Sequence, residues 1–382
     1  MRLVHTSDWH LGRTFIDASL IDDQRYVLEQ LIDIVKDTKP QALVIAGDIY
    51  DRPIPPADAV ALLDEVLTKL ILDLKTTVVI IAGNHDHPLR IEFGARIMEN
   101  LLLHIHGNPD ESRVSLRIPD DWGYVSLFAM PFMVPEKVRE HLKEPMVTDQ
   151  ETASKAWINL IRANQSQSER SVLIGHAFVA GCETSESERH WIGGAETVPP
   201  ECFEGFDYVA LGHLHRSQFV SDERLNYSGS ILKYSFSEAT QTKSVSLVEL
   251  DESGNCSITR CPLRPRRDVR CIEGTFSDLL HKAQEYPQRG DYIQVKLLDR
   301  GPILNARGRL KEVYPNLLEV DPVGLISLAT ESSQKTNDRA MSPTAMFASF
   351  YKDATGETLT DEQMSEFRSI IERVDQDERE AS

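Results

Sequence analysis

The segment ALVIAGDIYD (42–51) is an apolar run that ends in a glycine and two acidic side chains. Continuous apolar runs of this kind are typical of parallel strands that are buried on both faces. RLVHTSDWH (2–10) and VVIIAGNHDH (78–87) repeat the pattern. The intervals between them, about 20–37 and 56–74, carry apolar residues at helical spacing. The order strand–helix–strand–helix–strand predicts parallel pairing with right-handed crossovers, which brings the polar clusters to one edge of the sheet.

A second group of strands is expected further along the chain. A helix is predicted near 148–164. The short alternating segments 224–231 and 244–251 indicate a more antiparallel second sheet. Other strands are predicted at 124–132, 171–176 and 207–215. The expected fold class is therefore α/β, with two sheets packed face to face in a sandwich that is flanked by helices.

The chain of 382 residues is too long for one ordinary domain. A proline- and arginine-rich stretch, CPLRPRRDVR (261–270), indicates a boundary, and a polar, apolar-poor stretch around 329–343 indicates a linker. The expected parts are a main domain (1–262), a small α/β cap domain (263–325), a linker (326–341) and a C-terminal helical hairpin (342–382).

Two short amphipathic helices are predicted in the C-terminal part. Ser342 and Pro343 are typical of a helix start, and Thr360 with Gln363 forms a capping box for the second helix. Their apolar stripes can dock onto the main body or bind a partner protein. The stripe residues that we take as partner-binding are Met346, Phe347, Phe350, Met364, Phe367, Ile370 and Ile371.

Composition limits the classes of protein that fit. No apolar run approaches the ~18 residues of a membrane span, and the N-terminus lacks the features of a secretory signal. Five cysteines without a CxxC pair favour a reducing cytoplasm. The net charge of −19 produces a negative electrostatic field that repels nucleic acids. A nucleic-acid substrate would therefore need positive surface from bound metals and a local basic patch, or from a partner.

Five clusters of residues that can bind a metal ion lie at the ends of predicted strands. The clusters are Asp8-x-His10, Gly47-Asp48-x-x-Asp51, Gly83-Asn84-His85-Asp86, Gly175-His176 and Gly212-His213-x-His215. Imidazole and oxygen ligands without cysteine favour Mn²⁺, Fe²⁺ or Zn²⁺. Seven ligands are too many for one ion but fit two, with a carboxylate between them. The glycines before Asp48, Asn84, His176 and His213 allow sharp turns or close backbone approach.

Paired ions activate a water molecule and offset the charge of a phosphate in the transition state. The leaving alkoxide needs a proton donor, and His85, directly after Asn84, is the candidate for that role. Asp51 and Asp86 are expected to orient histidines rather than to bind an ion.

These five motifs, in this order, resemble the calcineurin-like metallophosphoesterases. The chain is more specifically similar to the SbcD family of bacterial nuclease subunits. The segments that carry this similarity are HTSDWHLGR, VIAGDIYDRPIPP, AGNHDH, SESER, DYVALGHLHRSQ and YSGSILKYSFSE. The resemblance implies that Asp8, His10 and His215 hold one ion and that Asn84, His176 and His213 hold the other. Asp48 would bridge the two ions, and His85 would assist the leaving group.

The resemblance also implies an activity and partners. Members of this family act in DNA repair, recombination and replication as Mn²⁺-dependent double-strand exonucleases and single-strand or hairpin endonucleases. They form a heterotetramer with an SMC-like SbcC-type ATPase and dimerise through the phosphoesterase domain. The implied cap would contact DNA, the hairpin would bind the ATPase, and the location would be cytoplasmic and nucleoid-associated.

Two other functions stay open at this point. The first is a two-metal phosphodiesterase or phosphatase that acts on a small nucleotide or a phosphoprotein, although neither substrate requires a cap or a hairpin. The second is a non-catalytic scaffold with the same fold, although all seven predicted ligands are present.

Overall fold

The structure is a computed structural model, and it describes residues 1–109, 115–166, 168–188, 197–324, 344, 347–348, 351–352 and 358–367. The chain divides into two compact units. The first consists of Met1–Cys271 with Gly290–Tyr292, and the second of Ile272–Arg289 with Ile293–Ser382. The boundaries expected at 262, 325 and 341 stay predictions.

The first sheet of the first unit has six strands. Four of them, β1, β4, β5 and β6, are parallel, and β15 and β16 continue the sheet in antiparallel pairing beyond β1. In the order in which they pair, the strands are β16 (Cys256–Pro262), β15 (Ser244–Leu250), β1 (Arg2–Thr6), β4 (Ala42–Ala46), β5 (Thr77–Ile81) and β6 (Leu103–His106).

The second sheet also has six strands. Its central strands are parallel, and each of its two edge strands is antiparallel to its neighbour. In pairing order they are β13 (Gln218–Phe219), β14 (Leu225–Tyr227), β12 (Tyr208–Gly212), β9 (Arg170–His176), β8 (Gly123–Met130) and β7 (Ser115–Asp120).

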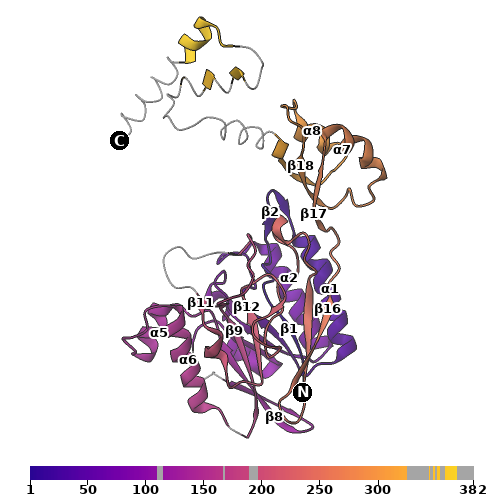
Figure 1. The fold of residues 1–382 in the computed structure, drawn as a ribbon. Helices are drawn as coiled ribbons and strands as arrows, with labels where there is room; N and C mark the ends of the chain where they lie inside the picture. Colours follow the sequence, from indigo (N-terminus) through magenta and orange to yellow (C-terminus); the bar gives the residue numbers. More distant parts are fainter. Residues whose placement is uncertain are drawn as a thin grey trace. The chain divides into compact units, whose positions relative to one another are not determined.

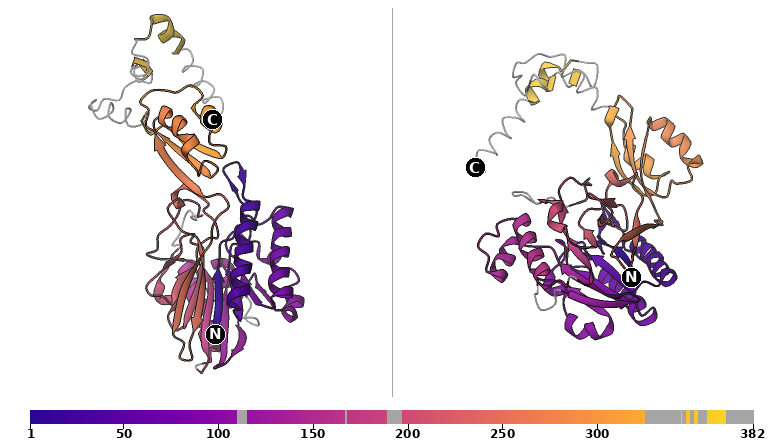
Figure 2. Two further views of the ribbon diagram at one scale, coloured as in Figure 1. Left: turned by 90° about the vertical axis from the view of Figure 1, so that its right-hand side faces the viewer. Right: turned by 60° about the horizontal axis from the view of Figure 1, so that its bottom comes forward.

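Helices lie on the outer sides of the paired sheets. Figures 1 and 2 show α1 and α2 on one side and α5 and α6 on the other. The longer helical segments are α1 (Ile21–Thr38), α2 (Ala57–Thr68) with a π-helical continuation (Lys69–Asp73), α5 (Pro135–Leu142) and α6 (Gln150–Asn164). Shorter ones follow β5, namely α3 (Pro88–Ile91), α4 (Ala95–Met98) and a 3₁₀ turn (Glu99–Leu101).

Apolar packing between the layers holds this unit together. One core fills the space between the sheets, where Leu3, Val44 and Val79 of the first sheet meet Val172 and Ala210 of the second. Another packs the outer face of the second sheet against α5 and α6; its members include Phe128, Met130, Val138, Trp157, Ile161 and Leu173. The predicted α/β sandwich of two sheets flanked by helices is confirmed.

The placement predicted for the strand at 244–251, β15, was wrong. β15 does not join the second sheet but pairs antiparallel with β1 in the first. β14 lies in the second sheet as predicted, where it pairs antiparallel with β13 and parallel with β12. The alternation of apolar and polar residues shows which face of a strand is buried, but it does not identify the neighbour with which the strand pairs.

The second unit contains most of a three-stranded sheet, in the order β17 (Val269–Gly274), β18 (Tyr292–Leu297) and β19 (Leu317–Asp321). α7 (Phe276–Lys282) and α8 (Ala306–Lys311) contribute to its core. In the tail, Gln363 N–H donates to Thr360 Oγ1 (3.3 Å) and Thr360 N–H to Gln363 Oε1 (2.9 Å), which confirms the capping box. Ser342, Pro343, Met346, Phe350, Ile370 and Ile371 lie outside the described residues.

Candidate metal centre

The seven predicted ligands converge from five loops. Each loop follows the carboxyl end of a parallel strand: β1, β4 and β5 in the first sheet, and β9 and β12 in the second. The side chains come together because both sheets direct these strand ends to the same edge of the sandwich. Five of the seven are almost fully buried, namely Asp8, His10, Asp48, His176 and His215. Asn84 and His213 are partly buried.

A first group consists of Asp8, His10 and His215. One potential ligand atom from each lies within 4.8 Å of the others. The two Nε2 atoms of His10 and His215 are 3.0 Å apart. Ligands that bind one ion at 2.0–2.1 Å and at right angles lie about 3 Å apart, so this spacing fits two imidazoles on a shared cation.

A second group consists of Asn84, His176 and His213. The side-chain oxygen of Asn84 is 3.0 Å from His176 Nε2 and 3.0 Å from His213 Nδ1. The other ring nitrogen of His176, Nδ1, lies 2.8 Å from the carbonyl oxygen of Ala46, to which it can donate when it carries the proton. His176 Nε2 would then present a lone pair to a cation.

Asp48 lies between the two groups. Its Oδ2 is 3.6 Å from His10 Nε2, and its Oδ1 is 3.6 Å from His176 Nε2. One oxygen therefore faces each group, which is the arrangement that a bridging carboxylate requires.

The electrostatics of the site favour neutral imidazoles. Burial is the main reason that the pKa values of His10, His176 and His215 are lowered, and it lowers the pKa of His213 to about 3. Neighbouring histidines lower the pKa of His10 and His213 further. A neutral imidazole has the free lone pair that a metal ion needs.

The two buried carboxylates are close enough to repel each other. Burial first, and then the charge of Asp48, raise the pKa of Asp8 well above its usual value. Burial alone would raise the pKa of Asp48 too, but His176 and His85 outweigh it and the pKa is lowered. Buried His10 Nδ1 has no hydrogen-bond partner within the described residues. The oxygen and imidazole ligands of the site suit divalent cations.

The backbone around the site is unusual. Asp8, His10, Asp48 and His213 all have positive φ angles, between 45° and 110°, which residues other than glycine rarely adopt. Gly212 permits close contact between the two sheets, because a Cβ atom there would lie 1.8 Å from the carbonyl oxygen of Ala46. This supports the expectation that the glycine before His213 allows close approach.

His85 points into the site from the loop after β5. Its Nδ1 lies 2.8 Å from the carbonyl oxygen of Asp51, and its Nε2 is 3.9 Å from Asp48 Oδ2. The ring makes an edge contact with that of His10, with the centroids 4.6 Å apart. A second arrangement is also geometrically open, because His10, Asp51 and His85 form a further group that could hold an ion.

Asp51 and Asp86 have different surroundings. Asp51 Oδ1 is 3.7 Å from His10 Nδ1 and 3.3 Å from an Arg13 nitrogen. Asp86 instead accepts backbone N–H groups of Ile49 (3.1 Å), Tyr50 (3.0 Å) and Gly83 (2.9 Å). Asp86 therefore joins the loops after β4 and β5 through their backbones, which differs from the expectation that it would orient a histidine.

Four residues that surround His215 carry no metal-binding motif of their own and were not predicted: Ser187, Glu188, Glu238 and Lys243. Ser187 Oγ is 2.6 Å from His215 Nδ1, and Glu188 accepts the backbone N–H of His215 at 2.7 Å. Ser187 and Glu188 lie in SESER and Glu238 in YSGSILKYSFSE, two segments that carried the family resemblance without any assigned chemistry.

Comparison with known proteins identifies the family of the chain. The calcineurin-like phosphoesterase profile matches residues 1–217, and that of SbcD_C, the type 5 capsule protein repressor C-terminal domain, matches residues 265–355. The SbcD component of the SbcCD nuclease of Staphylococcus epidermidis is 31% identical over 372 residues, which are 97% of this chain and 98% of that protein.

Solved structures are similar only at a distance. The calcineurin-like phosphoesterase YfkN of Bacillus subtilis is 14% identical with a TM-score of 0.37, over 68% of this chain and 88% of that one. A dimetal phosphatase of Danio rerio is 12% identical with a TM-score of 0.43, over 69% and 96%. The chain has a candidate ligand set for the dimetal centre that this family uses. It belongs to the calcineurin-like phosphoesterase family and, within it, to the SbcD nuclease subunits, and it is a phosphodiester hydrolase.

Proposed function

We propose that the chain cuts DNA as a double-strand exonuclease and as an endonuclease on single strands and hairpins, in DNA repair, recombination and replication. The observation that carries this proposal is the pair of ligand groups on either side of Asp48. They lie in a chain that also matches a nuclease subunit along nearly its whole length. The match of residues 265–355 favours the nuclease over a small-nucleotide or phosphoprotein enzyme.

We propose two Mn²⁺ ions as the cofactor, because imidazole, carboxylate and amide oxygen donors suit this ion. Asp8, His10 and His215 would hold one ion and Asn84, His176 and His213 the other, with Asp48 shared between them. When bound, the ions supply an activated water and offset the charge of the phosphate.

His85 would act on the leaving group. The bond between its Nδ1 and the Asp51 carbonyl fixes the ring, so that Nε2 faces the interior of the site. When both nitrogens are protonated, Nε2 can donate to the leaving alkoxide, and the Asp51 carbonyl stabilises the charged ring through Nδ1. Asp51 would also hold the backbone of its loop in place through its ion pair with Arg13.

The partners would be DNA and an SbcC-type ATPase, with which the chain would form a heterotetramer. The name of the Staphylococcus epidermidis relative places that protein in an SbcCD complex. In the C-terminal tail, the rings of Phe347 and Phe367 are stacked with centroids 3.7 Å apart, so both predicted stripes contribute to one apolar cluster. Residues 342–382 would bind the ATPase through this cluster, and residues 263–325 would contact DNA. The net charge of −19 favours a complex in which the partner supplies basic surface.

A cytoplasmic, nucleoid-associated location follows from a DNA substrate, and it is also supported by the cysteines, all five of which are free thiols. Among the described residues, none of the helices has the length and apolar character to cross a lipid bilayer.

We also propose a homodimer through the helices that follow β5. The segment from α3 to the 3₁₀ turn exposes an apolar stripe in which Phe93 is 85% and Ile97 77% exposed. Leu89 (69%) and Leu101 (56%) add to the exposed apolar surface of this segment. Contiguous exposed apolar side chains of this kind mark interaction surfaces on soluble proteins.

A Phe93→Asp variant should therefore be monomeric. A charge at the centre of an apolar interface is expected to raise the dimer Kd by at least about 30-fold, which sedimentation velocity over a concentration series would measure. Leu304→Asp is the matched control, since Leu304 is also exposed (91%) but lies in the second unit. A Phe93→Asp protein that stays dimeric would rule out this interface.

The function itself is tested with the full-length chain and its ATPase partner. Linear duplex DNA, hairpin DNA and a cyclic nucleotide are supplied in parallel, each with Mn²⁺ and with EDTA. We expect Mn²⁺-dependent degradation of both DNA substrates, loss of that degradation in EDTA, and no turnover of the cyclic nucleotide. Faster hydrolysis of the cyclic nucleotide than of DNA would show that the proposed substrate is wrong.

A further inference from the structure

A chain of buried polar side chains extends from His215 away from the candidate metal centre. His215 Nδ1 is 2.6 Å from Ser187 Oγ, and Ser187 Oγ in turn donates a hydrogen bond to Glu238 Oε1. Glu238 is fully buried, and its Oε2 forms an ion pair with Lys243 Nζ at 2.6 Å. His215, Ser187, Glu238 and Lys243 are each at most 9% exposed. Residues far apart in the sequence thus form one continuous polar path.

The directions of the hydrogen bonds in this path follow from the chemistry of its members. An ionised carboxylate can only accept hydrogen bonds, so Glu238 accepts one from the Ser187 hydroxyl. The Ser187 oxygen is then free to accept from His215, which places the imidazole proton on Nδ1. Nε2 is left with its lone pair, and this is the nitrogen that faces His10 Nε2 at 3.0 Å. The path therefore selects the tautomer of His215 that can bind a cation.

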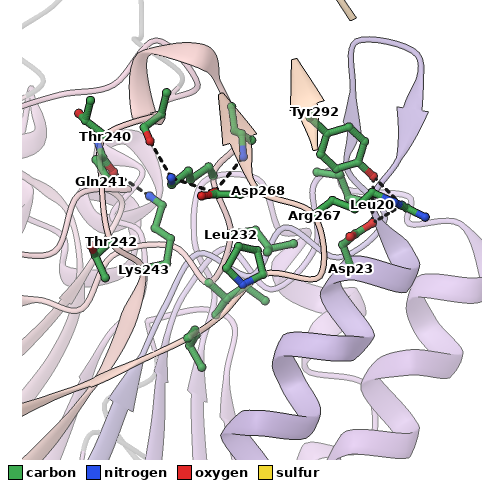
Figure 3. A pocket seen from close by; sticks show the side chains of 16 residues that line it. Leu20, Asp23, Leu232, Thr240, Gln241, Thr242, Lys243, Arg267, Asp268 and Tyr292 are labelled. Carbon is green, nitrogen blue, oxygen red and sulfur yellow. Dashed lines mark hydrogen bonds and ion pairs between the residues drawn. The ribbon is translucent and has the colours of Figure 1, made fainter. Parts of the chain in front are cut away.

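Lys243 keeps the path in this state. Buried carboxylates tend to be neutral. A protonated Glu238 could donate a hydrogen bond to Ser187, which would reverse the direction of the hydrogen bonds along the path. The Lys243 ammonium, 2.6 Å from Oε2, stabilises the ionised form of Glu238. Lys243 is itself held by the His215 carbonyl (2.7 Å) and Gln241 Oε1 (2.8 Å). It lines a cavity of about 250 Å³, in which Figure 3 shows its contact with Gln241.

In the second ligand group, a different partner fixes the tautomer of His176. His176 Nδ1 faces the carbonyl oxygen of Ala46 at 2.8 Å, a backbone acceptor that no side-chain substitution removes. Among the described residues, a replaceable hydroxyl and carboxylate therefore orient His215, whereas a backbone carbonyl orients His176. This asymmetry allows the two ions to be distinguished by mutation.

We propose that Ser187 and Glu238 are positioning residues that set the tautomer and orientation of His215, and so determine the affinity of the ion held by Asp8, His10 and His215. The proposal rests on the proposed metal centre and deepens it, because neither residue touches an ion or the substrate. Residues that orient a metal-binding imidazole typically change metal affinity about 10–100-fold when they are replaced.

The test measures Mn²⁺ binding to the full-length chain by titration calorimetry, together with the melting temperature of the metal-free protein. Ser187→Ala should weaken one of the two ions by about 10–100-fold and leave the other unchanged. Glu238→Gln should weaken the same ion, and Ser187→Thr, which keeps a hydroxyl, should restore much of the affinity. Ser185→Ala is the matched control, because Ser185 lies buried in the same loop and its Oγ accepts from Gln241 instead of contacting His215.

Two background variants identify which ion is affected. In His10→Ala, where the first ion is already lost, adding Ser187→Ala should change nothing; in His176→Ala it should weaken the ion that remains. The proposal is overturned if Ser187→Ala weakens both ions equally, weakens neither, or weakens the ion that His10→Ala retains. A wild-type chain that binds no Mn²⁺ would instead refute the metal centre itself.

Discussion

A His85→Ala variant is expected to lose about 10²–10⁴-fold in kcat on DNA while it keeps both metal ions. The reason is that His85 is placed to donate a proton to the leaving alkoxide and is not needed as a ligand. Hydrolysis of bis-p-nitrophenyl phosphate should fall much less, because p-nitrophenolate is a stable leaving group that needs little protonation. The measurements are single-turnover rates on both substrates and metal content by mass spectrometry.

His87→Ala is the matched control for this prediction, since His87 is exposed and only two residues away. It should retain both the rate and the ions. If His85→Ala lost an ion, the alternative group of His10, Asp51 and His85 would be the correct interpretation of the geometry. If the rates on DNA and on the nitrophenyl ester fell by the same factor, protonation of the leaving group would not be the role of His85.

The second large effect is on stability, and it is expected from a substitution of Asp120, away from the metal centre. Asp120, at the end of β7, binds Arg170 through both carboxylate oxygens and pairs with the Met1 ammonium at 2.7 Å. The side chains of Asp120 and Arg170 are 3% and 7% exposed. Asp120→Asn leaves two buried cations without a carboxylate, so we expect it to lower the free energy of unfolding by about 3–5 kcal/mol.

The pH dependence of this loss has a definite sign. The hydrogen bond from Arg170 is the main reason that the pKa of Asp120 lies below its usual 3.8. A lowered pKa contributes stability that is complete above 3.8 and is lost as the pH falls through the folded-state value. Urea unfolding should therefore show the full difference between wild type and Asp120→Asn at pH 7 and a smaller one below about pH 4. The exposed neighbour Asp121 provides the control, Asp121→Asn. A difference that widened in acid would contradict this account.

The parallel core of the fold was predictable because its signal is local. The apolar runs that become β1, β4 and β5, and the helices between them, are visible within short windows, and parallel crossovers have one handedness. The position of β15 was not predictable in this way. Its alternating pattern is compatible with either sheet, and its partner β1 lies at the other end of the first unit.

The site shows the same division between local and long-range information. Asp8, His10, Asp48, Asn84, His176, His213 and His215 could be identified because each follows a strand in a short motif, and the ends of parallel strands converge. The positive φ angles at Asp8 and His213 are set by tertiary contacts and have no sequence signature in residues other than glycine. The contact of Ser187 with Glu238 joins residues 51 positions apart, so no local pattern connects them.

The antiparallel pairing of β15 with β1 also has a consequence for biosynthesis. Until Ser244–Leu250 leave the ribosome, the strand that carries Asp8 and His10 into place has only β4 beside it and presents an open edge. Such edges recruit other strands and promote aggregation. A truncated product that stops near residue 217, where the phosphoesterase profile ends, would contain every metal ligand and still be expected to accumulate as inclusion bodies. Loading with metal would thus follow the completion of β15 and β16 rather than the synthesis of the last ligand.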